Sequence, residues 1–155
     1  MGTYMKLDQH FGKFVNDVIS LDKTRVDRID KALSHLSDFC SNDEEVSKAK
    51  IDLYLQGSYA LGTGIKPIKG EFDVDVVLLL DVNQRPYDQQ SAQSILKWLA
   101  ARARTDKKWQ GTISQEKRCV RITYAGDFHI DIVPAIPYTG TIIGIPNRNE
   151  DSWEL

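Results

Sequence analysis

Two aspartates break a long apolar run, FDVDVVLLL, at residues 72–80. Successive side chains of a β-strand point to opposite faces, so Asp73 and Asp75 would lie on one face with Cα atoms about 6–7 Å apart. Two carboxylates at that separation can share a cation, and oxygen ligands favour Mg²⁺ or Mn²⁺. Burying both charges without a counter-ion would be costly, which favours a metal site. The alternative is a solvent-facing strand edge.

A third aspartate stands in another apolar run, FHIDIVPA, at residues 128–135. Ile130 and Ile132 would face the core and leave Asp131 on the opposite face of the strand. If this strand lies beside the first, three carboxylates meet at one point, as in a two-metal phosphoryl-transfer site. Asp131 would then also be able to accept the proton of an attacking hydroxyl group. The alternative is a hairpin residue that reaches solvent.

A glycine and a serine end the strand-like alternation that begins at Ile51. Gly57 would let the backbone approach a phosphate, and Ser58 can donate hydrogen bonds from its amide and its hydroxyl group. The following segment, YALGTGIKPIKG, adds small residues and two lysines available to anionic oxygens. Because GxxxxGK[ST] is absent, the segment is not a Walker A loop.

Composition limits the remaining classes. A chain of 155 residues with 41% hydrophobic and 27% charged residues suits one globular domain. The formal charge of −2 gives no overall basic field, so nucleic acid is not indicated as a partner. No apolar segment is long enough for a membrane span and no secretory signal is visible, so we expect a cytoplasmic protein. The histidines and cysteines form no zinc motif, and both cysteines are expected to be reduced core residues.

Periodicity positions these residues on an α+β framework. Helical spacing covers residues 11–19 and a second run that starts at Thr24, where Asp27 completes a capping-box-like arrangement, and ends at 41–43. Strands are predicted from Ile51 to Gly57 and over 72–80. The later predicted elements are a crossover helix, two strands joined as a hairpin at 125–127, and a further strand, at residues 92–103, 117–124, 128–133 and 141–145. Helices followed by a mixed sheet define the α+β class.

The combined motifs resemble the DNA polymerase β nucleotidyltransferase superfamily, in which a hydrophobic-Gly-Ser motif precedes two aspartate-bearing strands. The strings QGSYALGTGIKPIKGEFDVDVVLLL and HIDIVPAIP closely resemble the bacterial cGAS/DncV-like nucleotidyltransferases, the CD-NTases with SMODS-type synthases among them. The resemblance runs from about Ile51 to Ile145. It implies a polymerase-β-like palm, a mixed twisted sheet flanked by helices and preceded by the N-terminal helices.

The resemblance also implies an activity and a set of site residues. The activity is synthesis of cyclic di- or oligonucleotide second messengers from nucleoside triphosphates, with ATP expected among them, in bacterial anti-phage signalling. The implied catalytic residues and ligands of two Mg²⁺ or Mn²⁺ ions are Asp73, Asp75 and Asp131. The implied phosphate-binding residues are Gly57 and Ser58. Lys66 is expected to reach a phosphate as well; the alternative is that Lys66 is a solvated loop lysine. We also expect Tyr59, directly after Ser58, to line the nucleotide pocket.

The resemblance divides the chain into three parts. Residues 1–50 would form helices that pack on the core, residues 51–146 the catalytic core, and residues 147–155 the start of a linker to a C-terminal helical half absent from this chain. We therefore expect the isolated chain to be weakly active or inactive. Two alternatives stay open: a nucleotidyl transferase acting on a small molecule, a protein or an RNA end, and a non-catalytic nucleotide-binding fragment.

Overall fold

The computed structural model describes residues 23–57, 71–81 and 91–155, and these form an α+β domain, as predicted. The elements follow in the order α2 (Lys23–Asn42), α3 (Val46–Ala49), β1 (Lys50–Gln56), β2 (Phe72–Leu80), α5 (Ala92–Ala103), the 3-10 helix η3 (Lys107–Trp109), β3 (Ile113–Gln115), β4 (Val120–Tyr124), β5 (Phe128–Thr139), β6 (Ile142–Asn147) and β7 (Ser152–Glu154). Among these helices, none combines the length and the apolar character that crossing a bilayer would require.

The sheet is mixed and has β2 and β5 at its centre. Its main path runs β1-β2-β5-β4-β3, while β6 pairs with the distal part of β5 and β7 pairs with β6. The β2–β5 pair is parallel and the other pairs are antiparallel. A parallel pair needs a crossover connection, and the chain between β2 and β5 includes α5. This topology brings the two aspartate-bearing strands side by side.

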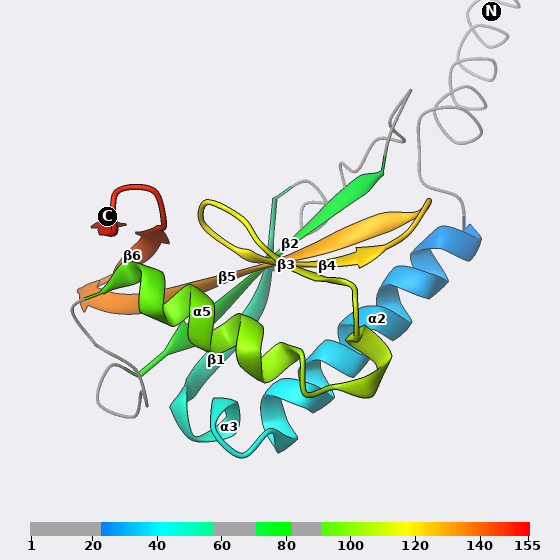
Figure 1. Ribbon diagram of the computed structural model, residues 1–155, viewed down its shortest axis with the longest axis horizontal. Coiled ribbons are helices and arrows are strands. Elements are labelled where there is room, and N and C mark those ends of the chain that lie inside the picture. Colours follow the sequence, from blue (N-terminus) through cyan, green and yellow to red (C-terminus); the bar gives the residue numbers. More distant parts are fainter. Residues whose placement is uncertain (1–22, 58–70, 82–90) are drawn as a thin grey trace, which may run out of the picture.

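One face of the sheet is buried under the helices, which lie together on one side of the strands in Figure 1. Alternate residues of β2 supply the apolar side chains of this face: Phe72, Val74, Val76, Leu78 and Leu80. Helix α5 packs on the core through fully buried residues that include its predicted inner face: Ile95, Leu96, Leu99 and Ala103. From α2 come Ile29, Ala32, Leu36 and Phe39, and all belong to a single core cluster. Burial of each large side chain stabilises the fold by about 1.5–3 kcal/mol.

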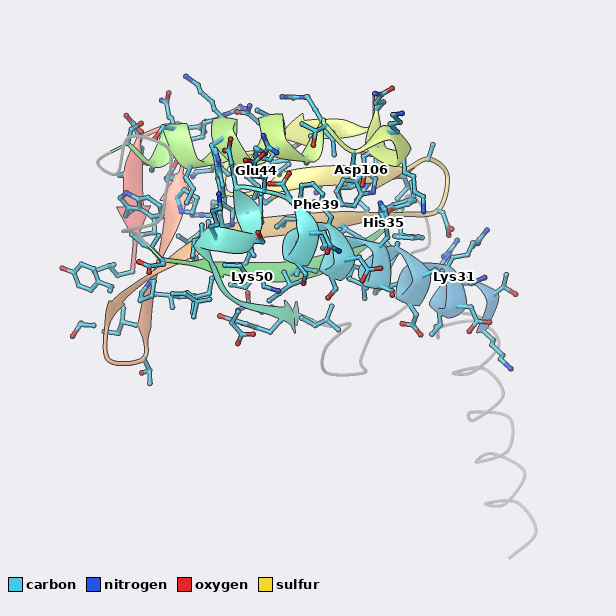
Figure 2. All side chains as sticks on the ribbon, turned by 90° about the horizontal axis from the view of Figure 1, so that it is seen from below. Lys31, His35, Phe39, Glu44, Lys50 and Asp106 are labelled. Carbon is cyan, nitrogen blue, oxygen red and sulfur yellow. The ribbon has the colours of Figure 1, made fainter. Side chains whose placement is uncertain are left out.

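Polar contacts join α2, α3 and α5 outside that core. Asp43, just before α3, accepts hydrogen bonds from the backbone amides of Glu45 and Val46, at 3.0 and 2.9 Å. The Arg102 side chain in α5 lies 2.7 Å from the second oxygen of Asp43. Figure 2 views the molecule from this helical side, where His35 of α2 lies 2.9 Å from Asp106, just after α5.

Several local predictions differ from the structure. Thr24 was expected to cap its helix, but Lys23 is already helical, so Thr24 cannot be the N-cap. The strand predicted from residue 117 begins at Val120, and β5 extends beyond 133 through Pro134 and Pro137. Proline has no backbone N–H to donate, so a strand tolerates it at positions where the sheet does not need that hydrogen bond. The C-terminal residues have no periodicity, yet they contain β7. The helix predicted over residues 11–19 lies outside the described residues.

Candidate active site

The register of β2 and β5 places the three aspartates on one face of two adjacent strands. Asp75 is the parallel partner of Asp131, and Asp73 is the partner of His129. Paired residues on neighbouring strands point to the same face of a sheet, so all four side chains lie on one face, opposite the helices. Exposure falls across the group, from the exposed Asp73 to the half-buried Asp75 and to Asp131, which is 8% exposed. The predicted convergence of the two strands is therefore present.

Gly57 lies next to Asp75, at the edge of β2 that faces β1 and not β5. Strand β1 runs antiparallel to β2 and pairs Gln56 with Asp75, so Gly57 follows directly beside that carboxylate. Gly57 has φ of +74°, and a Cβ placed on it would lie 2.8 Å from Oδ2 of Asp75. Both the backbone conformation and the space require glycine here. The predicted nucleotide-binding residues Ser58, Tyr59 and Lys66 lie outside the described residues.

Arg121 is a member of the site that the sequence analysis missed. It lies in β4 opposite Asp131, and its Nε and Nη2 donate hydrogen bonds of 2.7 and 2.8 Å to the two oxygens of Asp131. Nη2 is also 3.7 Å from Oδ1 of Asp73. This bidentate geometry is the strong form of an arginine–carboxylate pair, and its hydrogen bonds to Asp131 raise the pKa of Arg121 above its ordinary value. Counting back from the predicted turn at 125–127 would have set these residues opposite each other.

His129 is the second missed residue, and it links two acidic side chains. Its Nε2 lies 3.2 Å from Oδ1 of Asp73, and its Nδ1 lies 2.7 Å from Oε2 of Glu71. The approach to Glu71 is short but does not have the angles of a hydrogen bond. The other oxygen of Glu71 accepts a 2.8 Å hydrogen bond from the Gly126 amide in the β4–β5 turn. His129 thus contacts the Asp73 carboxylate and can fix its orientation.

The carboxylates carry more negative charge than Arg121 offsets. Burial raises the pKa of Asp75, and repulsion from Asp131 and Asp73 raises it further, while Arg121 lowers it. A divalent ion would relieve this repulsion, and carboxylate oxygens are ligands that Mg²⁺ and Mn²⁺ accept. The three carboxylates therefore fit Mg²⁺ or Mn²⁺ in the type of ligand atom, and they lie on one face of paired strands. Within residues 23–57, 71–81 and 91–155, however, no three His, Cys, Asp or Glu side chains are gathered closely enough to hold an ion. In this arrangement Arg121 engages both oxygens of Asp131.

The sequence matches one protein family over nearly its whole length. Residues 5–155 match SMODS, the Second Messenger Oligonucleotide or Dinucleotide Synthetase domain. A curated relative, the c-di-GMP synthase of Roseivirga ehrenbergii, is 34% identical over 142 residues, which are 88% of this chain and 37% of that protein. The chain thus spans little more than a third of the curated relative that it matches.

Solved structures share the fold. The Bradyrhizobium diazoefficiens CD-NTase CdnG, in complex with GTP, has a TM-score of 0.69 at 18% identity over 87% of this chain and 39% of that one. CdnC from E. coli MS115-1, in a CdnC:HORMA-deltaN complex, has a TM-score of 0.62 at 18% identity over 94% and 45%. The CdnE c-di-GMP synthase from Capnocytophaga granulosa has a TM-score of 0.59 at 17% identity over 98% and 54%. At these identities the likeness concerns the fold.

Proposed function

The chain belongs to the SMODS family, and we propose that it is the catalytic part of a metal-dependent nucleotidyltransferase that makes cyclic di- or oligonucleotides from nucleoside triphosphates. The observation that supports this proposal is the strand register that sets Asp75 opposite Asp131, with Asp73 on the same face and Gly57 beside it. A core role would put apolar residues at these positions, whereas an open cluster of carboxylates suits phosphoryl transfer. The role of the products as second messengers in anti-phage signalling is part of the proposal.

The roles proposed for the residues follow from their positions. Asp73, Asp75 and Asp131 would hold Mg²⁺ or Mn²⁺, which in such sites lowers the pKa of the attacking hydroxyl and neutralises charge on the leaving group. Asp131 would accept the proton of that hydroxyl at a carboxylate oxygen. Gly57 leaves room for the backbone to approach a phosphate, and Ser58 would donate hydrogen bonds to it. His129 and Glu71 would keep the Asp73 carboxylate oriented.

The substrate proposal combines two indications. The family resemblance favours ATP, and the curated relative is a c-di-GMP synthase, which makes GTP the first nucleotide to test. The experiment incubates the longest natural protein that contains this chain with labelled GTP and ATP and Mg²⁺, treats the products with phosphatase, and identifies them by mass spectrometry. We expect a phosphatase-resistant cyclic product.

The matched variants are Asp73→Asn/Asp75→Asn and Asp52→Asn, the latter an exposed aspartate of the neighbouring strand β1. The double variant should lose the product and Asp52→Asn should keep it. An unchanged product spectrum in the double variant would contradict the metal assignment. A linear product, or label on a different acceptor, would instead support the alternative transferase. If the unmodified protein and both variants bind nucleotide without turnover, the non-catalytic alternative would be supported.

A further inference from the structure

We propose that Arg121 is an internal counter-ion of the metal site, and that a divalent ion can complete its ligand set only after Arg121 has left Asp131. The guanidinium would hold the third carboxylate in the metal-free protein and exchange for the metal when nucleotide arrives. This inference rests on the proposed function, because it takes Asp73, Asp75 and Asp131 as the metal ligands.

The position of the guanidinium supports the exchange. Its two hydrogen bonds use both oxygens of Asp131, at 2.7 and 2.8 Å. The same Nη2 lies 3.7 Å from Asp73, so it stands between two of the three carboxylates that would share an ion. If Arg121 stayed on Asp131, a divalent ion bound to those carboxylates would lie close to the positive charge of the guanidinium, and the two would repel each other strongly at a site partly shielded from water. One of the two cations must move.

Arg121 is the cation that can move. Its side chain is 28% exposed, whereas that of Asp131 is 11% exposed and is fixed in the central strand β5. Leaving Asp131 costs the guanidinium two charge-assisted hydrogen bonds, and it needs other anionic oxygens to replace them. A nucleoside triphosphate carries such oxygens, and the planar fork of the guanidinium can bind two oxygens of a phosphate as it binds two of a carboxylate. Metal and nucleotide should therefore bind cooperatively, with Arg121 passing from Asp131 to a phosphate.

The test measures Mn²⁺ binding directly, by electron paramagnetic resonance of free Mn²⁺, with and without a non-hydrolysable GTP analogue. Without nucleotide, Arg121→Gln should bind Mn²⁺ about tenfold more tightly than the unmodified protein, within the usual range of coupling between sites. The analogue should raise the Mn²⁺ affinity of the unmodified protein more than that of Arg121→Gln. Equal or weaker Mn²⁺ binding by Arg121→Gln would overturn the proposal.

Two further variants separate local exchange from other causes. Arg118→Gln removes the same charge close by in the sequence, but Arg118 pairs with Glu154, 2.6 Å away, rather than with an aspartate of the site. It should bind Mn²⁺ like the unmodified protein, and a gain equal to that of Arg121→Gln would refute the exchange. Arg121→Lys keeps a cation without the two-pronged geometry, so a smaller gain in Mn²⁺ affinity is expected. This variant decides the question if Arg121→Gln does not fold.

The double variant Asp73→Asn/Asp75→Asn distinguishes this inference from the proposed function. If it still binds Mn²⁺ like the unmodified protein, the aspartates are not the ligands and both proposals fail. If it loses Mn²⁺ binding while Arg121→Gln gains none, the metal site stands and only the role of Arg121 is overturned.

Discussion

Gly57 and Asp75 are neighbours across β1 and β2 with no room for a methyl group between them, since a Cβ on Gly57 would lie 2.8 Å from Oδ2 of Asp75. Gly57→Ala should therefore displace the Asp75 carboxylate and, in the longest natural protein that contains this chain, reduce product formation at least about tenfold. It should also lower the free energy of unfolding by roughly 1–2 kcal/mol, the cost of a left-handed alanine. Activity assays and denaturant unfolding measure the two effects.

Gly111 offers a matched control, because it has a similar φ of +77° but no atom within 4 Å of the added Cβ. Gly111→Ala should lose stability to a similar extent and keep its activity. If both variants lost activity equally, crowding of Asp75 would not be the cause.

His129→Gln tests whether the imidazole orients Asp73. Loss of an outer-shell partner typically costs 10- to 100-fold in metal affinity or activity, and we expect a loss of about tenfold in Mn²⁺ affinity. His35→Gln is the control, since His35 also faces a carboxylate, Asp106 at 2.9 Å, but on the helical side. Unchanged Mn²⁺ affinity in His129→Gln would rule out the orienting role.

Asp43 should make stability depend on acid pH. Burial raises the pKa of Asp43, but hydrogen bonds from Arg102 and from the Val46 and Glu45 amides outweigh it and hold the pKa below its ordinary value of 3.8. The stabilisation is thus present above the unfolded-state pKa and is lost as the pH falls through the lower, folded-state pKa. Asp43→Asn should lower the free energy of unfolding by about 1–3 kcal/mol at neutral pH, and by less under strongly acidic conditions.

Urea unfolding of the unmodified protein and of Asp43→Asn, from neutral to strongly acidic pH, measures this difference in the free energy of unfolding. Asp52→Asn, at an exposed position of β1, should show no such loss. A difference between Asp43→Asn and the unmodified protein that stays constant down to the most acidic pH would contradict the assignment.

The two cysteines should be unreactive in the folded chain. Burial raises the pKa of Cys40 to about 12, and burial followed by repulsion from Asp131 does the same for Cys119. Because the thiolate is the reacting species, a thiol-specific disulfide reagent at mildly alkaline pH should modify the native protein at least about a hundredfold more slowly than the unfolded one. Equal rates in native and denaturing buffer would show that these sulfurs are accessible.

Long periodic elements could be predicted from the sequence, and short ones could not. The helix expected over 92–103 is α5, and the strand expected over 72–80 is β2, because a full stripe of buried side chains specifies each. By contrast, α3, β3 and β7 have only three or four residues each. Segments that short contain too few side chains for a period to be recognised.

The site divides in the same way. Asp73, Asp75 and Asp131 stood out because a charge in an apolar strand is unusual and needs an explanation. Arg121 and His129 did not, because each is an ordinary member of an alternating strand until its neighbour is known. Their importance depends on the register between strands, which composition does not reveal. The hairpin sets Arg121 opposite Asp131, whereas His129 lies beside Asp73 only through the parallel pairing of β2 with β5.

The parallel pairing of β2 with β5 has a consequence for how the chain folds. The antiparallel hairpin of β4 and β5 closes over a short turn, so Arg121 and Asp131 can meet early. Asp75 joins Asp131 only when a much longer loop closes, which costs more chain entropy and is slow. We therefore expect the arginine to reach Asp131 before the other two aspartates do, so that the charge of Asp131 is already paired when the centre of the sheet forms and buries it.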